Sequence, residues 1–523
     1  MYVQKRPPAP RAGSLASLVA SWQKPCRGPC PKVNLKLREA GSTVARIRQQ
    51  LFLALSSFSL AHFFCVARPN NIQRPMSTPS AIEASLHGAS LAGPPALDNT
   101  VDGAAIVSIA HGERGVTKLR DLLAGDVLGA SDRALALSLI SAQVRGAIHG
   151  ESERARDFAL RGGVVDVSLS LLVRDDDELV RARAAALIGD LLRGSGTGDS
   201  TVFISGDGLA AVAVSACSDA AASVRSASAE ALVAAFGGDL AAVSAFAVEP
   251  GAVSALADAV RVAGSGAVRA AALFVSRGGD AAIAASLIEG APLLVAVIDW
   301  LAATGNALGI ADTFAKGPEV DPSSLDLDAA PADAALDALI ALRSLCVTSE
   351  GKEAAFAANA HSAIMPFLSS SYAVVITAAA GTLSSLCIHL PALRALLDSF
   401  GQEGGALVCG ALLPILKSLQ HPSLNFAARG LIRAVASLPG GRAAAFAAAI
   451  ALRAVRELVC VLPIADAARD LVDIAKMDVE GPQSHAALEG LDELCKRPGG
   501  REEVLELPVG ERVLDMLSTL NES

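Results

Sequence analysis

Three arginines at one interval are the residues of this chain whose type and position best suit recognition chemistry. Arg181, Arg225 and Arg269 each follow a valine, and each lies 44 residues from the next. An arginine guanidinium is planar and permanently charged, and it binds carboxylates through two parallel hydrogen bonds. Equivalent positions of stacked units would place these guanidiniums about 10 Å apart, the usual distance between packed helices. The interval therefore predicts a ladder of cations that contacts an acidic partner protein.

Further charged residues accompany the ladder. Arg183, Asp190 and Glu230 lie within the same runs as the arginines, so they complete the predicted contact surface. A structural interpretation stays open beside this one, in which each arginine pairs with an acid at a repeat junction, such as Asp177 or Glu178. In that case the arginines hold the fold together and contact no partner.

The sequence shows no pattern typical of an active site, a cofactor site or a metal site. The glycine-rich RGSGTGDS at 193–200 follows a helical segment and has no lysine after it. A phosphate-binding loop instead follows a strand and carries a lysine at the start of the next helix. The eight histidines have no metal-ligand spacing, and DDDE at 175–178 is typical of a solvated turn. We therefore expect a protein that is not an enzyme and that holds neither cofactor nor metal.

Positioning such a ladder requires a repeated structural unit, and the sequence contains one. VRARAAALIGDLLRG, VRSASAEALVAAFGG and VRAAALFVSRGG begin at the same interval as the arginines. Within one unit we expect a short helix that ends at glycine, a second helix through VVDVSLSLLV and a third through LVRARAAALIGDLL. Two sets of residues keep the same phase along the chain: Gly163, Gly208, Gly251 and Gly290, and Phe158, Phe203 and Phe246.

The third segment of the unit has the apolar spacing of a helix with one buried face. Val180, Ala184, Leu187, Ile188 and Leu191 recur at intervals of three and four residues. Apolar residues make up 52% of the chain and aromatic residues 4%, and strand-like alternation is nearly absent. Three helices in a unit of about 42–45 residues resemble the armadillo repeat. The sequence therefore predicts an all-α fold, an armadillo/HEAT-like right-handed superhelical solenoid of about six to eight repeats with the third helices along its concave side.

Composition divides the chain into five segments. Residues 1–75 are basic, with 12 Lys or Arg residues and one acid, and 76–112 are a polar, flexible lead. N-terminal armadillo repeats are expected over 113–301. An acidic loop with three prolines is expected to interrupt the solenoid over 302–331, and armadillo-like repeats with a C-terminal cap over 332–523.

The basic segment leaves the compartment open. It has the composition of a targeting peptide, yet its apolar run at 51–67 is short for a membrane span, and Met76 is an alternative start of the mature chain. We expect a cytoplasmic protein, with an organelle or the endoplasmic reticulum as the alternative if residues 1–75 act in targeting. The acidic body argues against nucleic acid as a partner, and we expect no membrane association by the repeats.

Two residue types in the C-terminal half carry structural expectations. Pro366 and Pro414 occupy matching places in SAIMPFL and GALLPIL, and proline suits the first turn of a helix. Cysteines inside helical apolar runs are typical of small core residues rather than of disulfides. These cysteines are Cys346, Cys387, Cys409 and Cys460.

One family resemblance rests on the repeats. The run ARDFALRGGVVDVSLSLLVRDDDELVRARAAALIGDLL at 155–192 resembles the core of the armadillo-type nucleotide-exchange factors of heat-shock 70 kDa chaperones, the Hsp70-binding-protein family. SVRSASAEALVAAF and AVRAAALFVS are similar to its next two third helices, and ALDALIALRSLCV to its last. The resemblance covers about 110–350. The acidic loop and the units after 360 exceed the compact four-repeat core of that family.

The resemblance implies a co-chaperone. Its concave face would grip one lobe of the chaperone's ATPase domain and speed the release of ADP. The contact residues would then be Arg181, Arg183, Arg225 and Arg269. The alternative is a generic armadillo scaffold or adaptor that binds an extended peptide or a partner protein in its concave groove.

Overall fold

A computed structural model describes residues 112–125, 127–146, 152–193, 205–317, 324–326, 334–418, 421–477 and 481–507. Within these ranges the chain forms helices joined by short turns, and the only strand-like pairing is an isolated parallel bridge between Asp326 and Tyr372. The predicted all-α fold is therefore confirmed. The basic segment 1–75 and nearly all of the predicted flexible lead lie outside the described residues.

The N-terminal half consists of two opening helices followed by repeat units. The opening helices are α5 (Gly112–Ala124) and α6 (Ala130–Val144). The units follow as α7 (Ser152–Arg161), α8 (Val164–Arg174) and α9 (Glu178–Leu192); α10 (Gly206–Ser218) and α11 (Ala222–Gly238); and α12 (Leu240–Val248), α13 (Ala252–Ala263) and α14 (Ser265–Leu287). Helix α14 is bent at Gly279, so it combines a third helix with the first helix of the next unit.

The C-terminal half continues the same order of helices. It comprises η2 (Ile288–Gly290), α15 (Pro292–Ala307), α16 (Ile310–Ala315) and α17 (Ala334–Leu345); α18 (Ser349–Ala357), α19 (Ala360–Ile364), η4 (Met365–Ser369) and α20 (Ala373–Leu386); and α21 (Leu390–Gln402), α22 (Gly404–Ser418) and α23 (Pro422–Val435). The last helices are α24 (Pro439–Ala451), α25 (Val455–Val459), α26 (Ile464–Met477), α27 (Pro482–Cys495) and α28 (Gly500–Glu506).

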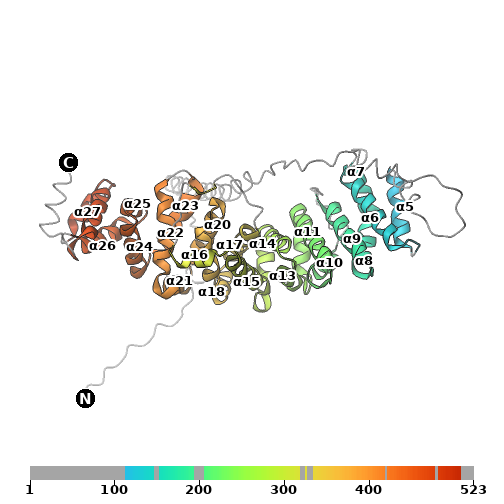
Figure 1. Cartoon of the computed structure of the whole chain (residues 1–523), viewed down its shortest axis with the longest axis horizontal. Helices are drawn as coiled ribbons and strands as arrows, with labels where there is room; N and C mark the ends of the chain where they lie inside the picture. Colours follow the sequence, from blue (N-terminus) through green and yellow to red (C-terminus); the bar gives the residue numbers. More distant parts are fainter. Residues whose placement is uncertain are drawn as a thin grey trace, which may run out of the picture. The chain divides into compact units, whose positions relative to one another are not determined.

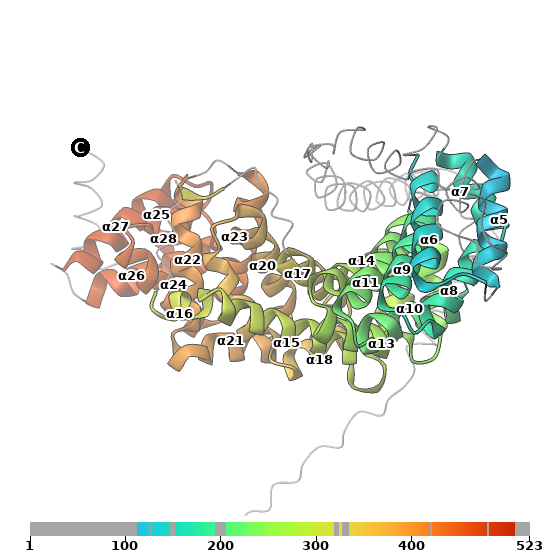
Figure 2. The ribbon, with the colours of Figure 1, turned by 45° about the vertical axis from the view of Figure 1, so that its right-hand side comes forward.

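Equivalent helices of successive units pack on one another and form two layers. The third helices α6, α9, α11, α14, α17, α20 and α23 form one series, in which each contacts the next. The second helices α8, α10, α13, α15 and α19 form the other series. Figures 1 and 2 show this order, from α5 in blue to α27 in red. The predicted stack of helical repeats is confirmed, and each unit buries its apolar faces against its neighbours.

Helix α9 illustrates how the sequence produces a third helix. The carboxylate of Asp177 accepts a hydrogen bond from the backbone N–H of Val180, which satisfies one of the free donors at the helix start. All five residues of the predicted apolar face are buried. A Cβ atom added at Gly189 would lie 3.2 Å from the Cα of Ala231, so α9 and α11 approach closely because small residues face each other.

The glycine markers are confirmed at three of four positions. Gly163, Gly251 and Gly290 have φ values of 74°, 77° and 88°, a left-handed conformation that glycine adopts without strain. Gly208 instead lies inside α10, so the expectation that it precedes that helix is wrong. Among the phenylalanine markers, Phe203 lies outside the described residues.

The acidic loop is shorter than predicted. Helix α15 continues to Ala307 and α16 follows at once, so the prediction of a loop is wrong for 302–315. The three prolines of the segment 302–331 begin at Pro318, so no proline interrupts a helix in the part of that segment before it. Phe314 of α16 is buried and packs edge-to-face on Phe400 with ring centroids 5.7 Å apart, which gives this segment its own core contact.

The prolines and cysteines of this half follow the predictions in part. Pro366 stands at the start of η4, whereas Pro414 lies in the interior of α22, so its predicted place in a first turn is wrong. Burial raises the pKa of the thiols of Cys346, Cys387 and Cys409 to about 12, which keeps them protonated core residues. Cys460 is exposed, contrary to the prediction.

Candidate protein-binding surface

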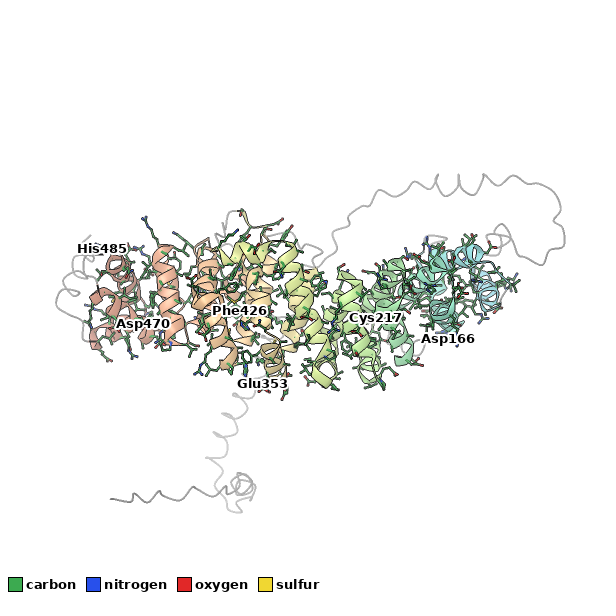
Figure 3. The ribbon with its side chains drawn as sticks, turned by 60° about the horizontal axis from the view of Figure 1, so that its bottom comes forward. Asp166, Cys217, Glu353, Phe426, Asp470 and His485 are labelled. Carbon is green, nitrogen blue, oxygen red and sulfur yellow. The ribbon has the colours of Figure 1, made fainter. Side chains whose placement is uncertain are left out.

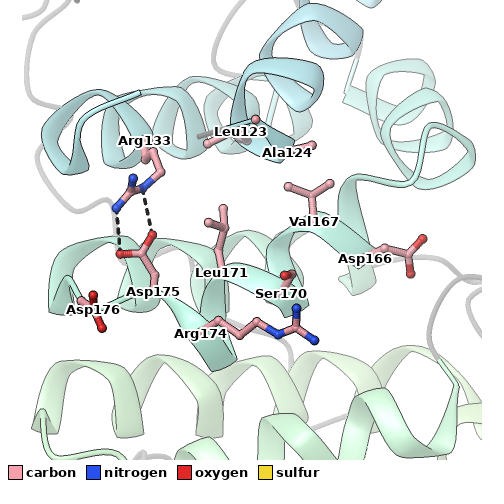
Figure 4. Close-up of a pocket in the computed structure, with 11 residues that line it drawn as sticks. Leu123, Ala124, Arg133, Asp166, Val167, Ser170, Leu171, Arg174, Asp175 and Asp176 are labelled. Atoms are coloured by element: carbon pink, nitrogen blue, oxygen red, sulfur yellow. Dashed lines mark hydrogen bonds and ion pairs between the residues drawn. The ribbon is translucent and has the colours of Figure 1, made fainter. Parts of the chain in front are cut away.

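Arginines and aspartates of neighbouring units pair across their junctions in the N-terminal half. Arg133 of α6 lies 2.8 Å from the carboxylate of Asp175, and Arg181 of α9 lies 2.8 Å from that of Asp219. Figure 4 shows the first pair in the wall of a hollow between α5, α6 and α8. In both cases the aspartate stands directly after the second helix of the unit that follows. The pairs therefore connect one unit to the next.

Each of these arginines also caps a turn of its own unit. Arg181 donates to the backbone oxygens of Asp175 and Asp176 at 3.0 Å each, and Arg133 donates to that of Leu128 at 2.9 Å. The hydrogen bond from Arg181 lowers the pKa of Asp219 below its usual value. For Arg181 the structure thus agrees with the structural interpretation, although its carboxylate partner is Asp219 rather than Asp177 or Glu178.

Arg225 occupies the equivalent place in the next unit without a carboxylate. It donates to the backbone oxygens of Asp219 and Ala220 at 2.8 and 2.9 Å. Its Nε is buried and has no acceptor. In the two preceding units the residue after the second helix is an aspartate, Asp175 after α8 and Asp219 after α10. After α13 the equivalent residue is Gly264, which has a φ of 72°. An aspartate adopts that backbone conformation only with strain, so the series of ion pairs ends here.

Asp190 is not a surface residue. It is 4% exposed, and its carboxylate accepts hydrogen bonds from Ser141 of α6 and from Arg145, which follows α6, the latter at 2.7 Å. The prediction that Asp190 contacts a partner is therefore wrong. The alanines of α9 allow α6 to pack closely against it, and a buried carboxylate requires such partners.

A groove between α11 and α14 brings two of the predicted residues together. Glu230 of α11 and Arg269 of α14 line it with Arg193, which follows α9. Its volume is about 600 Å³, and its apolar lining includes Val233 and Leu273. Arg183, on α9, is exposed but does not line this groove. The sequence analysis missed Arg193, Val233 and Leu273, because only the spacing of equivalent positions was informative there.

The groove rests on a rigid base. Phe236, Phe246 and Phe274 are fully buried behind it, and their ring centroids lie 5.0 to 5.5 Å apart. Arg277 donates to the backbone oxygen of Phe236 at 3.0 Å and also to that of Gly237, which satisfies the carbonyl end of α11. A surface held this way meets a partner with little ordering of its own.

The charges in the groove have no partners within the described part of the chain. Arg193 and Arg269 are exposed, and neither has a hydrogen-bond or ion-pair partner there. The Glu230 carboxylate lies beside Gly266 at the start of α14, 3.4 Å from where a Cβ would stand, and it has no such partner either. The groove thus offers two cations and one anion to an incoming molecule.

A second hollow of about 580 Å³ lies at the N-terminal end of the repeats. Asp166, Arg174 and Asp176 line it with the paired Arg133 and Asp175, as Figure 4 shows. The paired groups serve the junction between units, and the other three charges are two carboxylates and one guanidinium. The groove between α11 and α14 offers the reverse balance, two guanidiniums and one carboxylate.

The described residues form neither a cluster of metal ligands nor a single helix that could span a membrane. No group of three or more His, Cys, Asp or Glu side chains there is placed to hold a metal ion. No single helix of the described residues has both the length and the apolar character needed to cross a membrane. Three pairs of helices meet these two criteria when taken together, but each pair is sharply bent where its helices join.

Comparisons with known proteins find only distant structural similarity. No family model matches the chain, and no curated protein matches it. The crystal structure of an engineered protein is similar at a TM-score of 0.47 and 19% identity, over 79% of this chain and 98% of that one. A structure from work on a phosphorylation switch in the interaction between cadherin and beta-catenin is similar at a TM-score of 0.32 and 14% identity, over 84% and 82%. At these values neither structure indicates what this chain binds, and no comparison identifies the exchange-factor family that the repeats resemble.

Proposed function

We propose that this chain is a non-catalytic helical repeat protein that binds a partner protein, and that the groove between α11 and α14 is a contact surface. The observation that carries the proposal is the pair of exposed guanidiniums of Arg193 and Arg269 beside Glu230, which have no partner among the described residues. Charged groups of this kind steer a partner of complementary charge and fix its register. The rigid aromatic base and the half-buried Val233 and Leu273 add apolar contact area at the centre.

The finer proposal is a nucleotide-exchange co-chaperone of a heat-shock 70 kDa chaperone, working in the cytoplasm. Its support is the resemblance of 155–192 and of the following third helices to that family. On this proposal the groove grips one lobe of the ATPase domain. The exposed Arg183 on α9 also contacts that lobe, although it does not line the groove. The alternative proposal is a scaffold that holds an extended segment of another protein.

The release of labelled ADP from a heat-shock 70 kDa ATPase domain separates these two proposals. The full chain is expected to form a complex and to accelerate release, and Arg269→Glu is expected to weaken the complex by about tenfold. Arg394→Glu, an exposed change on α21, is the matched control and should leave both unchanged. Absence of both complex and acceleration would refute the exchange-factor proposal. A complex without acceleration would favour the scaffold.

A further inference from the structure

The third helices of the C-terminal half carry cations without carboxylates. Arg343 lies on α17, and Arg429 and Arg433 lie on α23, whereas α20 between them has no charged residue. Asp337 is the only acid of these three helices, and it already takes part in an interaction of its own. This distribution differs from the N-terminal half, where Arg133, Arg145 and Arg181 each bind an aspartate.

Arg343 is the most constrained of these cations. It is half-buried against α20, where a Cβ atom added at Gly381 would lie 3.4 Å from its guanidinium. In the part of the chain that the structure describes it has neither a hydrogen bond nor an ion pair. Burial lowers the pKa of Arg343, because a desolvated cation without a counter-charge is disfavoured. A carboxylate delivered to this position would relieve that cost.

Helix α23 carries a phenylalanine that is exposed to solvent, although large aromatic side chains are usually buried. Phe426 is 81% exposed, and Figure 3 labels it on the surface of the repeats. Arg429 and Arg433 follow it at i+3 and i+7, so the three side chains share one side of the helix. Arg429 is exposed and has no partner among the residues that the structure describes, while Arg433 donates from Nε to the backbone oxygen of Val461 at 2.8 Å.

Close helix packing brings these groups onto one surface. Gly381 of α20 accommodates Arg343, and Gly430 of α23 accommodates Ser384 of α20, whose hydroxyl would lie 3.4 Å from an added Cβ. Helices α17, α20 and α23 are consecutive members of the third-helix series. The surface therefore runs from a half-buried cation across a neutral, small-residue helix to an exposed aromatic ring and a second free cation.

We propose that this surface, formed by Arg343, Phe426 and Arg429, binds an acidic segment of a partner protein in which an apolar side chain lies between carboxylates. The carboxylates would pair with the two guanidiniums, and the apolar side chain would cover Phe426. The proposal rests on the proposed role in protein binding but uses a surface different from the groove between α11 and α14. A single-stranded nucleic acid is the less fitting occupant, because one exposed ring gives little base stacking.

Selection from a degenerate peptide pool tests the proposal with the full chain. The pool has Glu or Asp flanking a central Leu or Phe, and the control pool has Gln in place of each acid. The wild-type chain is expected to retain the acidic pool, and retention should fall as salt is raised. Phe426→Ala and Arg429→Gln are both exposed changes that leave the core intact, and each should weaken binding of a selected peptide by about tenfold.

Two controls separate this surface from the other contacts. Arg394→Gln removes an exposed arginine from α21, and Arg269→Gln alters only the groove between α11 and α14. Both variants should bind the selected peptide as the wild type does. Retention of the acidic pool with no effect of Phe426→Ala or Arg429→Gln would overturn the proposal while leaving a protein-binding role intact. Equal retention of both pools, or binding of a short single-stranded RNA in preference to them, would also overturn it.

Discussion

The third helices of the two halves of this protein are held at their junctions by different means. Between α6 and α11 the junctions contain ion pairs, with Arg133 on Asp175 and Arg181 on Asp219. After α17, α23 and α27 the chain instead makes a tight turn in which a glycine enters the next helix. A Cβ atom added at Gly351, Gly441 or Gly500 would lie only 1.8 to 1.9 Å from the carbonyl oxygen six residues earlier.

This difference determines which charges remain for other uses. In the N-terminal half Arg133, Arg181 and Arg225, near the start of their third helices, bind groups at the junctions. Arg269 at the equivalent place of α14, and Arg193 after α9, have no partner within the described residues. In the C-terminal half glycine turns follow α17 and α23, and Arg442 of α24 pairs with Asp470 of α26 at 2.8 Å. Arg343 and Arg429 have no partner within the described residues. Repeats that look alike in sequence therefore differ in what their side chains can do.

The largest expected effect comes from breaking a glycine junction. Gly441→Ala would place a methyl group 1.9 Å from the carbonyl oxygen of Val435, and this oxygen belongs to the backbone, which cannot move aside as the end of a flexible side chain can. We expect the free energy of unfolding to fall by about 3 kcal/mol or more, as measured by urea denaturation.

Its neighbour provides a matched control. Gly440 lies in the same first turn of α24, and a Cβ atom added there would meet nothing within 4 Å. Gly440→Ala should be neutral or should stabilise the chain by up to about 1 kcal/mol, because alanine loses less backbone entropy on folding. Equal destabilisation by both substitutions would contradict the glycine-junction account.

An ion-pair junction should give the next largest effect. Asp219→Asn leaves Arg181 half-buried without its carboxylate, and we expect a loss of about 2 to 3 kcal/mol in the free energy of unfolding. A double-mutant cycle with Arg181→Met isolates the pair. The exposed pair of Lys496 and Asp492 at the other end of the chain is the comparison, and Lys496→Gln should leave the free energy of unfolding almost unchanged. A coupling energy near zero for Arg181 and Asp219 would mean that the pair does not hold the junction.

The sequence predicted the repeat and left open an ion pair at each junction, but it did not identify the partner residues. Periodic apolar residues and the 44-residue interval of Arg181, Arg225 and Arg269 sufficed for the helical stack, since helix burial follows directly from spacing. The partner of each arginine did not follow, because Asp219 is 38 residues away from Arg181 and its approach depends on how two units pack. Asp190 was misjudged for the same reason, since its burial arises from contact with α6.

The groove itself combines predicted and unpredicted residues. Glu230 and Arg269 were named from equivalent positions, whereas Arg193 follows the end of α9 and enters the groove through the turn there. The glycine junctions could have been found, because LCVTSEG and VASLPGG place a glycine at the same distance from the last buried residue. What spacing did not reveal was that a carbonyl oxygen occupies the space of the missing Cβ.

Acid should affect the C-terminal half before it affects the ion pairs. Burial lowers the pKa of His361 on α19, and its Nδ1 has no hydrogen-bond partner. The unfolded chain then binds a proton near pH 6.5 that the folded chain does not, so stability falls as the pH drops below about 6.5, by at most about 1.4 kcal/mol per pH unit. Asp219 has a lowered pKa, so its contribution persists until the pH falls below about 3.9.

Urea denaturation of the wild type and of His361→Gln at about pH 7.5 and about pH 5.5 checks this order. The wild type should lose stability over that interval, and His361→Gln should lose less. His485 is exposed on α27, as Figure 3 shows, and His485→Gln should behave as the wild type does. A decline of the same size in His361→Gln would assign the acid sensitivity to other groups.

The smallest expected effect lies at the point where the ion-pair series ends. Arg225 retains its two hydrogen bonds to the backbone oxygens of Asp219 and Ala220 but has no carboxylate, so Arg225→Met should lower the free energy of unfolding by only about 1 kcal/mol. Arg181→Met removes the same two kinds of backbone bond and an ion pair besides, and it should cost clearly more. The difference between the two variants measures what the carboxylate adds at an N-terminal junction. If Arg225→Met proves as damaging as Arg181→Met, capping of the turn rather than ion pairing holds these units together, and the contrast between the two halves would rest on the glycine turns alone.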